Sequence, residues 1–193
     1  MPLQNRVTPL GELVATPERG LVYGNRGCLH DADQRIRRRW AVKRWISCRL
    51  EFRGRYRGVM PPGRYTGLFF LDEATAFAAG HRPCYECRRE DYNRYMELVG
   101  ERRADDADER LHAERLGPRT DASVEDLPDG AFVLVDGAAW LVLGDELRRW
   151  TPGGYTERRE RGGRAAVVTP ATSLSALRAG WDGVVPFLHP SAR

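Results

Sequence analysis

Two thiols lie three residues apart in the stretch AAGHRPCYECRRED, residues 78–91, as Cys84 and Cys87. Thiols at this spacing suit a metal site, a redox pair or simple burial in a core. A thioredoxin-like redox pair would follow the first strand of a βαβ unit, whereas this pair follows a predicted short helix. Two further cysteines, Cys28 and Cys48, lie upstream. Because four thiolates can complete a tetrahedral zinc site, we expect zinc bound by Cys28, Cys48, Cys84 and Cys87.

The stretch FFLDEATAFAAGHRPCYECRRED resembles the zinc-binding N-terminal domain of the Ada family of DNA methyl-phosphotriester repair proteins. In that family an aromatic strand leads to a short helix rich in Glu and Ala. The pattern G-[FYH]-R-P-C-x-x-C-R then supplies the second pair of zinc thiolates. The resemblance is strongest over residues 69–88, where six residues fall on family positions: Gly80, Arg82, Pro83, Cys84, Cys87 and Arg88.

A fainter resemblance to the same family extends upstream, over residues 42–49. The run VKRWISCR is similar to the family strand whose cysteine is both a zinc ligand and the methyl acceptor, which places Cys48 on that position. The family has its other ligand four residues later, where this chain has Phe52. The helix-turn-helix module that often follows in the family is missing. The resemblance therefore implies zinc and DNA, with one ligand position unmatched.

The fourth zinc ligand has several candidates. Cys28 and His30, in GCLHDAD, are the nearest donors in the chain, and His81 directly precedes the Arg82-Pro83 pair. With Cys28 the site would be all-thiolate, closed and structural. With a histidine it would be a Cys3His site. For His81 we expect instead an imidazole that covers a helix end, and His30 could equally be an ordinary turn residue.

Composition and charge narrow the class of protein. The chain has 193 residues, 41% of them hydrophobic and 30% charged, which is ordinary for a globular protein. It has no apolar run long enough to span a bilayer and no signal-peptide pattern at its start, so we expect a cytoplasmic protein that does not bind membranes. In that compartment thiols stay reduced, which favours metal binding over disulfides. The net charge is +4.

The charge is unevenly distributed along the chain. Residues 31–66 carry eleven basic and three acidic side chains, whereas residues 101–129 carry five basic and ten acidic ones. Aromatic residues are interleaved with the basic ones, a combination that can neutralise phosphates and stack on bases. We expect nucleic acid as the partner, DNA rather than RNA by the resemblance. The candidate contacts are Arg37, Arg39, Lys43, Arg44, Arg53, Arg55 and Arg57.

Two other classes of function remain open. The protein could be an enzyme, either with Cys48 as methyl acceptor or with acid–base chemistry at His112, which lies four residues after Asp108 on a predicted helix. It could also be a zinc-stabilised module that contacts only protein. The chain has no phosphate-binding loop, dinucleotide fingerprint, G-x-S-x-G or H-E-x-x-H motif.

The periodicity predicts an α+β fold. Strands are expected at 11–16, 20–25, 38–52 and 66–71, followed by helices at 73–79, capped by Asp72, and at 84–99. A zinc-binding half would span 1–100, and an acidic linker with a short helix would span 101–128. A small β-rich half over 129–193 would begin with a meander that turns at Asp136-Gly137. In this half 151–163 are expected as a loop, 165–170 as a strand and 172–180 as a helix.

Overall fold

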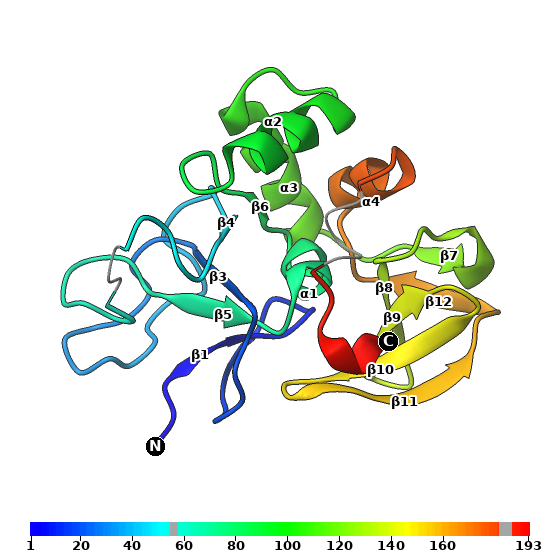
Figure 1. The fold of residues 1–193 in the computed structure, drawn as a ribbon, viewed down its shortest axis with the longest axis horizontal. Coiled ribbons are helices and arrows are strands. Elements are labelled where there is room, and N and C mark those ends of the chain that lie inside the picture. Colours follow the sequence, from blue (N-terminus) through cyan, green and yellow to red (C-terminus); the bar gives the residue numbers. More distant parts are fainter. Residues whose placement is uncertain (55–57, 182–186) are drawn as a thin grey trace.

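The computed structural model describes residues 1–54, 58–181 and 187–193. The described residues form two six-stranded sheets and four α-helices, which confirms the predicted α+β class. The sheets lie on opposite sides of the molecule, with the first helix between them (Figure 1). None of the helices in these three ranges is long and apolar enough to cross a membrane.

The first sheet is built from the N-terminal part of the chain, in the order β2-β1-β5-β3-β4-β6. Its strands are β1 (Gln4–Val7), β2 (Leu13–Ala15), β3 (Val22–Asn25), β4 (Ile46–Cys48), β5 (Leu68–Phe70) and β6 (Arg82–Pro83). The edge pair matters most for the site, because β6 runs parallel to β4 with Ser47 opposite Pro83. This register brings Cys48, the last residue of β4, and Cys84, which follows β6, to the same end of the sheet.

Only part of the strand predicted at residues 38–52 forms. Its strand residues are Ile46–Cys48, and the preceding segment turns instead. The amides of Ala41 and Val42 both donate to the carbonyl oxygen of Arg26, at 2.9 and 3.2 Å, which holds this segment as a loop across the end of β3. The prediction that the basic residues at 38–44 lie on a strand is therefore wrong.

The two helices around the cysteine pair differ in how well the sequence predicted them. Helix α1 (Glu73–Ala78) is confirmed: the Asp72 side chain caps it by accepting from the Thr75 amide at 2.9 Å. Gly80 ends it at φ +77°, a conformation that favours glycine. Helix α2 (Arg89–Leu98) begins five residues later than predicted. Cys84 to Cys87 form a turn instead, closed by the Arg88 amide on the Cys84 carbonyl at 3.0 Å.

The second sheet has the order β11-β10-β9-β8-β12-β7. Its strands are β7 (Asp121–Ser123), β8 (Phe132–Val135), β9 (Ala138–Leu143), β10 (Glu146–Thr151), β11 (Gly154–Glu160) and β12 (Arg164–Val167). The predicted tight turn is present, with positive φ at both Asp136 and Gly137, as a type I′ hairpin requires. The loop predicted at 151–163 is wrong, because β11 pairs there with β10 along its length.

The acidic segment 101–128 contributes packed structure between the halves. It contains helix α3 (Ala104–Leu116), whose Ala107 and Leu111 are fully buried, as well as β7 of the second sheet and a short 3-10 helix, Val124–Asp126. Helix α4 (Ala171–Arg178) packs against α3, and a second 3-10 helix, Pro190–Ala192, follows near the C-terminus.

One hydrophobic core joins the two halves. Phe77 of α1 and Tyr95 of α2 lie in the same buried cluster as Phe132 and Leu141 of the second sheet. Polar contacts follow the same route: the fully buried Asp72 accepts a hydrogen bond from the Tyr155 hydroxyl at 2.8 Å. We therefore expect the described parts of the chain to unfold together rather than as independent halves.

Candidate metal centre

Three cysteines form one buried cluster. The Sγ atoms of Cys48, Cys84 and Cys87 all lie within 4.8 Å of one another, and each residue is less than a tenth exposed. Zn–S bonds of about 2.3 Å in tetrahedral geometry would place bound sulfurs about 3.8 Å apart. The three thiols thus fit three corners of such a site, and the group could hold a metal ion.

The backbone sets this geometry. Strand β4 ends at Cys48, and the Cys84 amide donates to the carbonyl oxygen of Ser47 at 2.9 Å, which extends the β4–β6 pairing by one residue. The turn over residues 84–87 then brings Cys87 back toward the same point. This turn and the β4–β6 pairing together bring the three sulfurs into one cluster.

The three thiols share their protons unequally. Hydrogen bonds from the Cys48 thiol and then the Cys87 thiol lower the pKa of Cys84 to about 2, helped by the backbone amides of Cys87 and Glu86. The pKa of Cys48 is raised, first because its thiol is hydrogen-bonded to Cys84 and Cys87 and then by burial. The cluster therefore favours a thiolate at Cys84, and a cation would favour the deprotonation of the other two.

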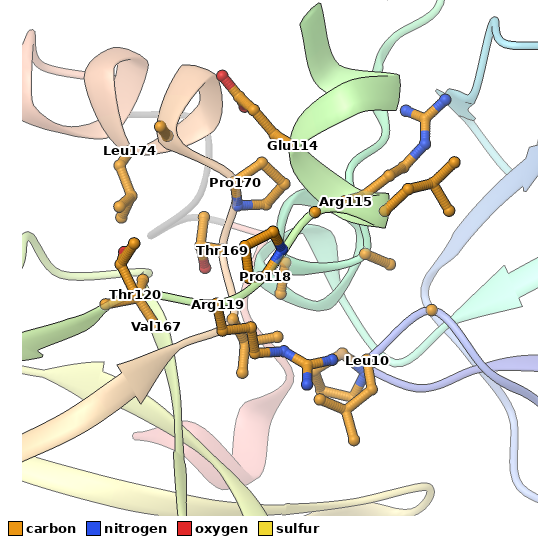
Figure 2. A pocket seen from close by; sticks show the side chains of 18 of the residues that line it. Leu10, Glu114, Arg115, Pro118, Arg119, Thr120, Val167, Thr169, Pro170 and Leu174 are labelled. Carbon is orange, nitrogen blue, oxygen red and sulfur yellow. The ribbon is translucent and has the colours of Figure 1, made fainter.

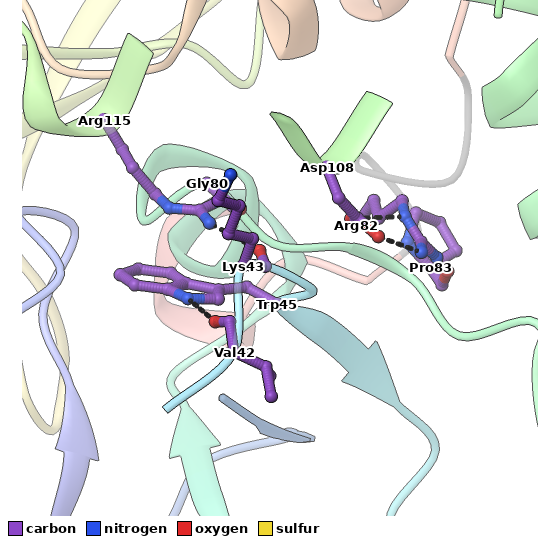
Figure 3. A network of polar contacts seen from close by, with 8 residues as sticks. All are labelled: Val42, Lys43, Trp45, Gly80, Arg82, Pro83, Asp108 and Arg115. Carbon is purple, nitrogen blue, oxygen red and sulfur yellow. Dashed lines mark hydrogen bonds and ion pairs between the residues drawn. The ribbon is translucent and has the colours of Figure 1, made fainter. Parts of the chain in front are cut away.

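Two buried arginines hold the turn from either side. Before it, the Arg82 guanidinium binds both carboxylate oxygens of Asp108 on α3, at 2.9 and 2.7 Å, as Figure 3 shows. After it, Arg88 forms an ion pair with the buried Glu73 of α1 and donates to the Ser47 hydroxyl at 3.2 Å. Burial raises the pKa of Glu73 to about 7, although the charge of Arg88 opposes this shift.

Cys28 lies outside the cluster, in contrast to the predicted ligand set. It is half-buried, and its Sγ faces the carbonyl oxygen of His30 at 3.6 Å. The register of the first sheet explains the separation. Tyr23 lies opposite Cys48, but β3 runs antiparallel to β4, so the chain has passed Ile46 by Asn25 and continues away from Cys48.

The two candidate histidines are engaged elsewhere. The Nδ1 atom of His30 lies 2.6 Å from the Thr66 hydroxyl. The Nε2 atom of His81 accepts from Nε of Arg26 at 3.1 Å, and its ring packs against Phe70 and Trp45. Among the described residues, no fourth His, Cys, Asp or Glu joins the three-cysteine group. Phe52, at the unmatched family position, packs against it.

The predicted nucleic-acid contacts are in different environments. Arg37 binds Asp31 at 2.6 Å and Lys43 binds Glu109 at 2.5 Å, so both have an acidic partner. Arg39 is exposed and lines a cavity, whereas Arg44 and Arg53 are exposed on the loops before and after β4. Arg55 and Arg57 lie outside the described residues.

The acid–base pair considered at Asp108 and His112 does not form. Both carboxylate oxygens of Asp108 face Arg82, and the Nδ1 atom of His112 lies 2.8 Å from Nη2 of Arg115. Burial and the nearby charges of Arg115 and Lys43 lower the pKa of His112. The imidazole is thus held against a cation rather than oriented by a carboxylate.

Comparison of the chain with models of protein families, with curated proteins and with solved structures finds no match. The site therefore has to be interpreted from its own residues. Sequence reasoning placed Arg82 and Arg88 on family positions but did not foresee their ion pairs with Asp108 and Glu73. It also missed Arg26, whose surroundings depend on segments distant in sequence.

Proposed function

We propose that the protein is a zinc protein that binds nucleic acid, with the ion joining β4 to the turn at residues 84–87. The convergence of the Cys48, Cys84 and Cys87 sulfurs carries the proposal. Thiolate ligands select zinc among the common cellular divalent ions, whereas calcium and magnesium prefer oxygen. The Ada-like pattern around Cys84 and Cys87 supports the same ion.

The burial of the cysteines favours a structural role for the ion. Cys48 is 3% exposed, and Tyr23, Phe52 and Phe69 surround the cluster. A methyl donor would need a path to the Cys48 sulfur, which this packing closes. The methyl-acceptor alternative is accordingly the weaker one, and the ion would act by fixing the edge of the first sheet.

Cobalt substitution tests the metal part of the proposal. Protein refolded with Co²⁺ in place of the native ion should show intense near-ultraviolet thiolate-to-cobalt absorption and the visible bands of tetrahedral cobalt. The Cys84→Ser variant should lose most of the thiolate absorption, whereas Cys28→Ser should keep it. Octahedral cobalt bands without thiolate absorption would contradict the proposal.

Exposed arginines on either side of β4 support nucleic-acid binding. Arg44 precedes the strand and Arg49 follows Cys48 directly, and both side chains are exposed. Tyr85, half exposed between the two cysteines of the turn, has the Arg89 guanidinium over its ring at 3.5 Å. Such a combination of cations and an exposed ring suits a phosphate backbone with unstacked bases.

The salt dependence of binding tests this part. For duplex or single-stranded DNA, the logarithm of the binding constant should fall linearly with the logarithm of the salt concentration. The double variant Arg44→Ala, Arg49→Ala should reduce the slope of this line by up to about two. Arg102→Ala, an exposed arginine distant in sequence from β4, serves as the matched control. If neither DNA nor RNA binds with a Kd below about 100 μM at low salt, nucleic-acid binding is contradicted. If that protein still contains zinc, a zinc-stabilised module that contacts only protein is the remaining alternative.

A further inference from the structure

A cavity of about 630 Å³ lies between the two sheets, distinct from the cysteine cluster. Its walls come from the loop after β1, from the loop before β4, from the end of α3 and from the segment joining β12 to α4. Figure 2 shows Arg119 extending its guanidinium toward Leu10 of the first of these loops. Five arginines and two glutamates line the cavity, so its charge is positive.

Arg26 is the most unusual of these arginines, because its side chain is fully buried. Its Nη1 atom donates to the carbonyl oxygen of Gly11 at 2.8 Å and its Nε atom to His81 at 3.1 Å. Its Nη2 atom has no hydrogen-bond partner, and no carboxylate of the described chain forms an ion pair with this guanidinium. Burial, followed by the charges of Arg115 and Arg39, lowers the pKa of Arg26.

A second guanidinium packs on the same tryptophan. The guanidinium carbons of Arg26 and Arg115 each lie 3.8 Å from the Trp45 ring centroid. Arg115 is fixed by the carbonyl oxygens of Gly80 and Lys43, at 3.0 and 2.6 Å (Figure 3), and its buried Nε atom has no partner. The two nitrogens without a partner, Nη2 of Arg26 and Nε of Arg115, are therefore the donors that remain for a ligand.

Neither of the two carboxylates that line the cavity forms an ion pair with Arg26. Glu114 accepts from the amide and hydroxyl of Thr172 at 2.9 and 2.8 Å, and so caps the start of α4. Glu12 is exposed at the rim. A fully buried guanidinium without an ion pair, such as that of Arg26, is costly in a folded protein, and an anion supplied from solution would remove that cost.

We propose that the cavity binds the phosphate group of a small ligand of about nucleotide size, with Arg26 and Arg115 as the phosphate-binding residues. A phosphate dianion can offset both guanidiniums, whereas a carboxylate offsets one, and the planar N–H edges of arginine match phosphate oxygens. The volume is within the range of small-molecule sites. Trp40, half-buried in the wall, offers a ring to the remainder of the ligand.

Gly11 keeps the space above Arg26 open. Its φ of +80° favours glycine, and a Cβ atom at this position would lie 3.8 Å from Nη2 of Arg26 and 4.0 Å from the Trp45 ring. The cavity is lined by none of the three clustered cysteines, so phosphate binding there does not depend on zinc binding.

Calorimetric titration of the full chain with inorganic phosphate, AMP and adenosine, at constant ionic strength, tests the site. Phosphate and AMP should bind with Kd below about 1 mM, whereas adenosine should not bind. Arg26→Met and Arg115→Met should each weaken AMP binding about tenfold or more, because a charge-assisted pair of hydrogen bonds is lost. Arg102→Met is the control and should bind AMP as the wild type does.

Three results would overturn the proposal. The first is a wild-type Kd for both phosphate and AMP weaker than about 10 mM. The second is unchanged AMP binding by a folded Arg26→Met protein or, if that variant does not fold, by the Arg115→Met protein, whose side chain is only part-buried. The third is displacement of AMP by a short single-stranded oligonucleotide, which would assign the cavity to a nucleic-acid strand instead of a small ligand.

Discussion

The amide of Cys84 donates to the carbonyl oxygen of Ser47 at 2.9 Å, and this bond places the Cys84 sulfur beside that of Cys48. The cluster of three cysteines is thus arranged by sheet pairing. Arg82 and Arg88 fix the turn to α3 and α1 through buried ion pairs. An ion bound here would stabilise an edge that the rest of the fold already positions.

Removal of the metal should lower the stability of the whole chain. Because the largest hydrophobic cluster contains residues of both halves, we expect a single unfolding transition at a reduced temperature rather than separate melting of the N-terminal half. An ion whose free concentration is a thousand times its Kd contributes about 4 kcal/mol to the free energy of unfolding. Calorimetric melts with and without a strong chelator measure this difference. Unchanged melts, with metal loss verified by elemental analysis, would exclude a structural ion.

Loss of the Asp108 carboxylate should destabilise the protein strongly. Asp108→Ala leaves the buried Arg82 charge unpaired, and we expect the free energy of unfolding to fall by about 3–5 kcal/mol. Replacing both partners, as Arg82→Met with Asp108→Leu, should restore much of the loss. Urea denaturation measures each value, with the exposed Asp106→Ala as control. A loss no larger than that of the control would show that the pair is not buried in solution.

His81 should make stability depend on pH. Burial, followed by the charges of Arg26 and Arg115, holds the pKa of His81 well below its usual 6.5. The unfolded chain therefore binds one more proton below pH 6.5, so stability falls as pH drops through this value, by up to about 1.4 kcal/mol per pH unit.

The variant His81→Gln isolates this contribution, since an amide can still accept from Arg26 but does not titrate. Denaturation of wild type and variant at about pH 7.5, 6.5 and 5.5 gives the difference in slope. Between about pH 6.5 and 5.5, we expect the variant to lose less stability than the wild type. Equal slopes would mean that His81 takes up a proton in the folded state.

Local sequence signals predicted the elements whose geometry they determine. The Asp72 cap and Gly80 indicated the two ends of helix α1, and Asp136-Gly137 indicated the hairpin turn between β8 and β9. Strand β11 was missed because five of its seven residues are exposed and polar, which leaves no alternation to detect. The predicted helix start at Cys84 was wrong because residues 84–87 form a separate turn and the regular helix begins at Arg89, a break that periodicity does not reveal.

The candidate site was predicted only in part, because only some of its residues are indicated by local sequence signals. Cys84 and Cys87 are close in sequence, and a family resemblance pointed to Cys48, whereas the exclusion of Cys28 depends on the register of β3 against β4. Arg26, Trp45 and Arg115 meet only through tertiary packing, so neither their spacing nor their composition indicates a site.

The zinc content of single cysteine variants tests the central claim most directly. Native mass spectrometry of protein purified without chelator should find one zinc per chain in the wild type and in Cys28→Ser, and a large loss in Cys48→Ser, Cys84→Ser and Cys87→Ser. Cys28→Ser is the matched control, since it removes the one thiol that lies outside the cluster. Absence of zinc from the wild type, or equal loss in Cys28→Ser and Cys84→Ser, would contradict a centre built on these three residues.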